Sequence, residues 1–128
     1  MATQSQIKRS SCPVSCALDV VGDKWTLLVI RDIMFLDKHY FVDFLTSPEK
    51  IASNILADRL KKLEESNIIH RQSDPENARR MIYTLTEKGE DLQPAMMELL
   101  RWAAKHDPAT GGHDCSIQDL ALNESGRV

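Results

Sequence analysis

The chain has 128 residues, 42% hydrophobic and 27% charged, which suits one domain with a modest core and leaves no room for a second. It has no apolar run near the ~20 residues that a membrane-spanning helix needs. The net charge is −3, from 16 Lys and Arg against 19 Asp and Glu, so nucleic-acid binding would have to rest on local basic residues.

Cysteine use and the first residues indicate a reducing compartment. Cys12, Cys16 and Cys115 are an odd number of cysteines, and their spacing suggests no disulfide staples. Lys8 and Arg9 precede no apolar stretch that could form the core of a signal peptide. We therefore expect a cytoplasmic protein that does not associate with a membrane.

Two helices are predicted first. Apolar residues recur at helical spacing over residues 12–21, and Gly22 ends that helix. A second helix is expected to begin after Asp23, which can cap it, and to reach about Leu36. So much of its surface is apolar that we interpret it as the central core helix.

A short helix, a turn and a longer helix come next. Residues 40–45 predict the short helix, and Ser47-Pro48 breaks its pattern. The longer helix, residues 53–66, turns leucines inward and has a polar outer face.

Residues 68–72 and 81–85 have strand character. The connector between them, residues 73–80, is interpreted as too long for a tight hairpin turn. We expect it to project as a loop with Arg79 and Arg80 at a basic edge.

A last helix is expected to be capped by Thr86 and to reach about His106. Pro94 lies inside this stretch, so a kink or a restart near Glu90 is predicted. The helix is apolar nearly all round, and a lone monomer could hardly cover it. The alternative is that it forms the core of the monomer.

These elements divide the chain into three parts. Residues 1–11 form an N-terminal arm, residues 12–106 form the folded domain, and residues 107–128 form a polar tail that we expect to be flexible or loosely docked. The order of elements predicts a mainly α fold with a small two-stranded β-wing, the winged helix-turn-helix. In that fold the long helix enters the major groove of double-stranded DNA and the wing reaches the neighbouring backbone or minor groove.

The long helix and the wing supply the candidate DNA-binding residues. Asn54 is the chief candidate for base reading, because its amide can pair with adenine N6 and N7 together. The basic residues suit phosphate neutralisation, Ser53 is expected to cap the helix, and the others project from its outer side. The full set is Ser53, Asn54, Ile55, Asp58, Lys61, Lys62, Arg79 and Arg80.

Local charge supports this set only slightly. Residues 58–80 hold six Lys and Arg against five Asp and Glu, an excess of one. Asp58 would repel phosphate unless it accepts from a cytosine N4 or pairs with Lys61 or Lys62. The lysines could also simply solvate a surface helix. The alternative function is therefore a winged-helix protein-interaction module that does not bind DNA.

Several separated blocks resemble the HxlR-type family of bacterial transcriptional regulators. They are Cys12-Pro13-Val14, residues 17–28, residues 51–64 and residues 83–89, in the family's order and spacing. The likeness covers about residues 12–105. Many relatives have serine where this chain has Ala52, which moves the expected helix cap to Ser53.

The resemblance implies a homodimer that presents two recognition helices to a roughly palindromic operator. Its first and last helices would form the interface, in agreement with the apolar character of the last helix. The expected interface residues are Val14, Leu18, Leu92, Met96, Leu99, Leu100, Trp102 and Ala103.

Cys12 is a candidate redox sensor. It lies at a helix start near Lys8 and Arg9, where positive charge favours the reactive thiolate. Some members of the family that it resembles sense oxidants or electrophiles through a cysteine at this place. The alternative is a small apolar residue packed beneath the dimer helices. The effector, whether a small molecule or an oxidant, is not indicated.

No metal, cofactor or enzymatic activity is predicted. The spacing of His106, His113 and Cys115 matches no zinc pattern. No phosphate-binding glycine loop, nucleophile elbow or spaced carboxylate pair occurs in the sequence.

Overall fold

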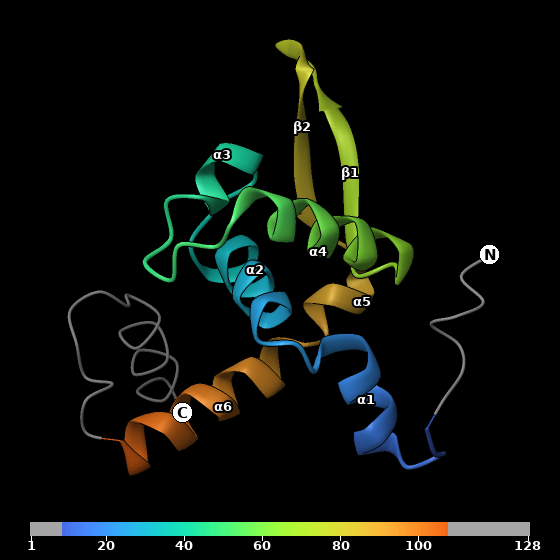
Figure 1. Ribbon diagram of the computed structural model, residues 1–128, viewed down its shortest axis with the longest axis vertical. Coiled ribbons are helices and arrows are strands. Elements are labelled where there is room, and N and C mark those ends of the chain that lie inside the picture. Colours follow the sequence, from blue (N-terminus) through green and yellow to red (C-terminus); the bar gives the residue numbers. More distant parts are fainter. Residues whose placement is uncertain (1–8, 108–128) are drawn as a thin grey trace.

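The computed structural model describes residues 9–107, so most of the expected N-terminal arm, and the tail from residue 108, lie outside the described residues. Figure 1 shows a helical body from which one hairpin projects. The elements are α1 (Pro13–Val21), α2 (Lys24–Phe35), α3 (Phe41–Phe44), α4 (Ser53–Glu65), β1 (Ile69–Asp74), β2 (Asn77–Leu85), α5 (Glu87–Glu90) and α6 (Gln93–His106). The predicted winged helix-turn-helix is confirmed, with α3 and α4 as the helix-turn-helix and β1–β2 as the wing.

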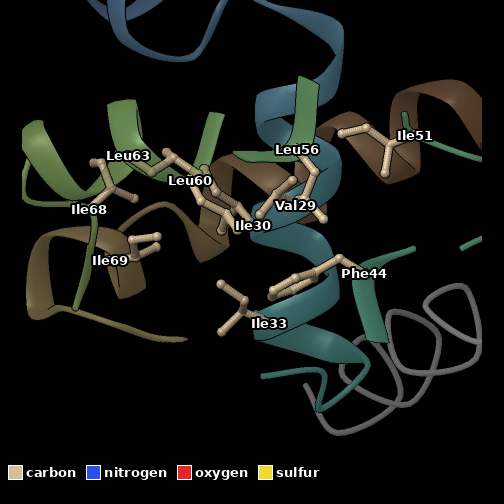
Figure 2. Packing of buried hydrophobic residues seen from close by; sticks show 10 residues of the cluster. All are labelled: Val29, Ile30, Ile33, Phe44, Ile51, Leu56, Leu60, Leu63, Ile68 and Ile69. Carbon is tan, nitrogen blue, oxygen red and sulfur yellow. The ribbon is translucent and has the colours of Figure 1, made fainter. Parts of the chain in front are cut away.

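The core lies around α2, as predicted. Figure 2 shows Val29 and Ile30 of α2 beside Leu56 and Leu60 of α4. Full burial of each such side chain stabilises the fold by roughly 1.5–3 kcal/mol. The buried hydrophobic cluster consists of Val29, Ile30, Ile33, Phe44, Ile51, Leu56, Leu60, Leu63, Ile68 and Ile69.

Two predicted helix caps are confirmed. The carboxylate of Asp23 accepts from the backbone N–H of Trp25 at 3.2 Å and so caps α2. The hydroxyl of Thr86 accepts from Gly89 N–H at 3.1 Å and so caps α5. The expected restart also occurs, because α5 ends at Glu90 and α6 begins at Gln93 with Pro94 in its first turn, where proline costs no helical hydrogen bond.

The interpretation of residues 73–80 as a long loop is wrong. Strand pairing continues to Asp74 opposite Asn77, so only Pro75 and Glu76 form the turn. The Asp74 carboxylate accepts from Glu76 N–H at 2.9 Å, which supports this tight turn. Ser73 pairs with Met81, so a register shift leaves residues 78–80 as a bulge in β2. The tip is exposed on most sides, and therefore its strands lack the hydrophobic alternation that would have revealed them.

Ser53 does not cap α4, contrary to expectation. The N-cap is Ala52, whose carbonyl accepts the first helical hydrogen bond from Leu56 N–H at 2.9 Å, and Ser53 is the first helical residue. No side chain caps this helix. The neighbouring Ile51 is buried in the core, which sets where the chain enters the helix. Within residues 9–107, no helix is long and apolar enough to cross a membrane.

Candidate nucleic-acid interface

The outer face of α4 is polar and open. Leu56, Leu60 and Leu63 are buried on the inner side, while Asn54 and Lys61 are exposed on the other. Leucines at i, i+4 and i+7 hold this helix against α2 and so fix the direction of its polar face. The predicted outward placement of Asn54, Asp58, Lys61 and Lys62 agrees with the structure.

Ile55 does not project from the outer side. It is half-buried and packs against the core cluster. One turn further on, Arg59 donates from Nε to Oδ2 of Asp23 at 2.5 Å and from Nη2 to Oδ1 at 3.2 Å. This flank of α4 therefore faces the start of α2. The hydrogen bond from Arg59 lowers the pKa of Asp23, although burial opposes it.

Asp58 is compensated within its own helix. Its Oδ2 lies 2.6 Å from Nη1 of Arg59 and 3.3 Å from Nζ of Lys62. Burial opposes ionisation of Asp58, but hydrogen bonds from Lys62 and Arg59 outweigh it and lower its pKa. Of the two lysines considered as partners, Lys62 is the one that pairs. Lys61 forms no ion pair within the described residues, so its charge is presented uncompensated.

The wing carries Arg79 and Arg80, both exposed, on the bulge of β2. The guanidinium carbon of Arg80 lies 3.8 Å from the centroid of the Tyr40 ring. The Tyr40 hydroxyl donates to Oδ2 of Asp74 at 3.2 Å. Tyr40 is absent from the predicted site, and no local pattern relates it to residues 34 or more positions away. Its only signal is an aromatic ring at the start of a very short helix.

The base of the wing is also attached to the helical body. Tyr83 N–H donates to the His39 carbonyl at 2.8 Å, and Nδ1 of His39 lies 2.9 Å from the Tyr83 carbonyl. Arg71 of β1 lies 3.5 Å from a carboxylate oxygen of Glu64 on α4. These contacts set the wing relative to the segment before α3 and to α4.

A partly buried polar network supports the turn before α4. Arg31 donates to both oxygens of Glu49 at 2.7 and 2.9 Å and also to Asp32. Ser47 donates to Asp32 at 2.6 Å and accepts from Lys38 at 2.9 Å. Partial burial would lower the pKa of Arg31, but the two carboxylates raise it overall. The site predicted from the sequence does not include these residues, because their positions along the chain follow no regular pattern.

A second surface, on α1 and α6, is apolar and uncovered. Val14 and Trp102 are each 66% exposed, and Leu18 and Leu99 are each 52% exposed. No residue of α1 is buried, and α6 buries only Met97. The alternative that the last helix forms the monomer's core is therefore wrong for this face. The remaining expected interface residues are half-buried: Leu92, Met96, Leu100 and Ala103.

Cys12 is the N-cap residue of α1 and is exposed. Cys16 is half-buried, and its Sγ lies 3.4 Å from the Ser10 carbonyl. In the single chain Cys12 is thus accessible to a reagent. His113 and Cys115, considered above as metal ligands, lie outside the described residues.

Known proteins share this architecture and much of the sequence. A family model described as HxlR-like helix-turn-helix matches residues 20–110. The HTH-type transcriptional regulator YodB of Bacillus subtilis is 39% identical over 93 residues, or 72% of this chain and 82% of YodB. The structure of reduced YodB from B. subtilis matches 77% of this chain and 96% of its own, with a TM-score of 0.62 and 34% identity. The redox regulator HypR in its oxidised form matches 74% of this chain and 97% of its own, with a TM-score of 0.65 and 29% identity.

Proposed function

Because the chain belongs to the HxlR-like helix-turn-helix family of transcriptional regulators, we propose that it binds a roughly palindromic operator in double-stranded DNA as a homodimer. The observation that carries this proposal is the exposed polar face of α4 together with the two exposed arginines of the wing. Figure 1 shows that the wing projects as a hairpin beside α4. A helix in the major groove and a wing on the adjacent backbone are the docking geometry of this fold.

The residues divide into base-reading and phosphate-binding groups. Asn54 lies in the first turn of α4, where side chains reach base edges, and its amide suits adenine. Lys61, Arg79 and Arg80 supply phosphate contacts, and Lys62 contributes while paired with Asp58. Ser53 and its neighbouring backbone N–H groups lie at the uncapped start of the helix, where a phosphate is favoured.

The apolar surface on α1 and α6 supports the homodimer. Its exposed side chains lie on the two elements that a second copy of the chain would cover in a two-fold assembly. Such a dimer would place its recognition helices about one DNA turn, ~34 Å, apart. Each subunit would then read one half of the operator.

Salt dependence of duplex binding tests the DNA proposal. With a duplex selected by the protein from random sequences, we expect affinity to fall steeply as salt rises, because phosphate contacts release counterions. Affinity that stays constant over the salt range would contradict phosphate binding. Failure to select any duplex would favour the protein-interaction alternative.

Two kinds of variant test the division of roles. Changing both Arg79 and Arg80 to alanine should weaken binding to all duplexes, selected or not. Asn54→Ala should cost ~1–3 kcal/mol mainly at its own base pair. Equal loss of specificity in both variants would overturn these assignments.

We also propose that Cys12 makes the regulator responsive to oxidants. It is exposed at the amino terminus of α1, and the redox regulator HypR shares the fold. In a disulfide between subunits, two Cys12 thiols would lose two protons and two electrons to a two-electron oxidant such as a diazene or a quinone. Cys12→Ser should abolish the effect of such an oxidant on DNA binding, whereas the matched variant Cys16→Ser should retain it. A persisting effect in Cys12→Ser would contradict the proposal.

A further inference from the structure

Tyr40 contacts both strands of the wing from outside the hairpin. It is the N-cap residue of α3, and its hydroxyl donates to Asp74 at the end of β1 while its ring faces Arg80 on β2. The neighbouring His39 is bonded to Tyr83 further down β2. The segment before α3 therefore joins the first helix of the helix-turn-helix to the tip and the base of the wing.

We propose that Tyr40 is a positioning residue for DNA binding, which holds the Arg80 guanidinium in the orientation that meets a phosphate. This inference rests on the proposed binding of DNA by the wing. A guanidinium stacked on an aromatic ring keeps its N–H groups in its own plane, directed away from the ring. The stacked group can therefore still donate to a phosphate, and less side-chain freedom is lost when it does.

The hydrogen bond to Asp74 fixes the ring that holds Arg80. Asp74 is only 8% exposed and also accepts from Glu76 N–H in the turn. The tyrosine is thus bonded to a carboxylate that the turn itself orients. The ring and the carboxylate together determine where the Arg80 guanidinium points.

Arg79 provides a matched control on the same bulge. It is exposed like Arg80, and it has no ring contact or ion pair among residues 9–107. Its backbone N–H donates to Oδ1 of Asn77, a bond that does not involve Tyr40. If Tyr40 acts through Arg80, the effect of changing Tyr40 on DNA affinity should depend on the presence of Arg80 and not on that of Arg79.

A double-mutant cycle on the selected duplex tests this coupling. Tyr40→Leu should weaken binding about two- to fivefold, the range that a partly exposed cation–π contact supports. In an Arg80→Ala background the same change should have almost no further effect, whereas in an Arg79→Ala background the full loss should persist. Equal losses in all three backgrounds would show general destabilisation and overturn the proposal.

The free protein supplies a readout that does not depend on DNA. The ring current of Tyr40 should shift the NMR signals of the Arg80 side chain, and Tyr40→Leu should remove that shift while Tyr40→Phe should keep it. Tyr40→Phe should still lose hydrogen-exchange protection at Glu76, because the bond to Asp74 is gone. Absence of the shift in the wild type would overturn the contact itself. If the shift is present and no salt-dependent DNA binding occurs, the proposed function fails and the role of Tyr40 with it.

Discussion

The helices α4 and α6 have similar lengths, 13 and 14 residues, and present opposite kinds of surface. The inner side of α4 buries three leucines and its outer side is polar. In contrast, α6 buries only Met97 and leaves Leu99 and Trp102 exposed. In Figure 1 the hairpin beside α4 and the helix α6 extend to opposite ends of the molecule.

This difference indicates which kind of partner each surface is suited to bind. A polar face on a helix whose apolar side is already buried needs no covering and suits a solvated, charged partner such as DNA. An apolar face that the monomer leaves open suits an apolar partner, and a second copy of α1 and α6 has the same character. Changes on the two helices should therefore have separable consequences.

The largest effect is expected from Trp102→Ala. A tryptophan at an interface centre contributes about 2 kcal/mol or more, and a two-fold axis would repeat the loss, so the dimer dissociation constant should rise roughly a thousandfold. Sedimentation velocity over a concentration series measures this change. The control is Lys61→Ala, an exposed change on α4, which should leave the oligomeric state unaltered. Identical behaviour of the two variants would remove the proposed separation of surfaces.

The next prediction compares the same substitution, leucine to alanine, at a buried position of α4 and at an exposed position of α6. Leu56 is fully buried, so Leu56→Ala should lower the free energy of unfolding by about 2–5 kcal/mol at every protein concentration. Leu99 is 52% exposed in the single chain, so Leu99→Ala should cost little when the protein is dilute and more as it dimerises. Urea denaturation at two protein concentrations distinguishes these cases. A large loss from Leu99→Ala in dilute protein would place Leu99 in the monomer core.

A smaller effect concerns the ionic support beneath α4. The hydrogen bond from Arg31 lowers the pKa of Glu49 below its ordinary 4.5, more than partial burial raises it. The ionised form is the one that the fold favours, so this stabilisation is present above pH 4.5 and is lost as the pH falls through the lowered pKa. Because the Glu49 side chain is 36% exposed, solvent screening limits the contribution to about 1 kcal/mol.

Glu49→Gln should therefore flatten the dependence of unfolding free energy on pH below 4.5. Glu65→Gln is the matched control, because Glu65 is exposed on α4 and has no ion pair in the described part of the chain. Urea melts at several acidic pH values measure both. An unchanged slope in Glu49→Gln would mean that the pair with Arg31 does not contribute to stability.

Features with a local signature were predictable from the sequence. Helical periodicity located α1, α2 and α4, and the residues Asp23 and Thr86 marked two helix starts through their ability to cap. Proline chemistry correctly predicted the break before α6. The order of these elements was enough to predict the winged helix-turn-helix.

Features that depend on tertiary contact were not predictable. The hairpin tip was missed for another reason: the bond between Asp74 and Glu76 is local, but the exposed strands beside it have no apolar alternation to reveal them. The bond between Arg59 and Asp23 joins residues 36 positions apart, and Tyr40 reaches Asp74 across 34. Such pairs follow from how the elements pack, and sequence spacing alone does not encode them.

The smallest effect on stability is expected at the start of α4, which lacks the side-chain cap that α2 and α5 have. Thr86→Ala should cost about 1 kcal/mol of stability because it removes a cap, whereas Ser53→Ala should stay within about 0.5 kcal/mol because Ser53 bonds to no N–H of its helix. Thermal unfolding measures both variants. If Ser53→Ala leaves stability unchanged and weakens duplex binding, the uncapped end of α4 serves the ligand and not the fold. A loss of stability equal to that of Thr86→Ala would mean instead that Ser53 caps α4 in solution.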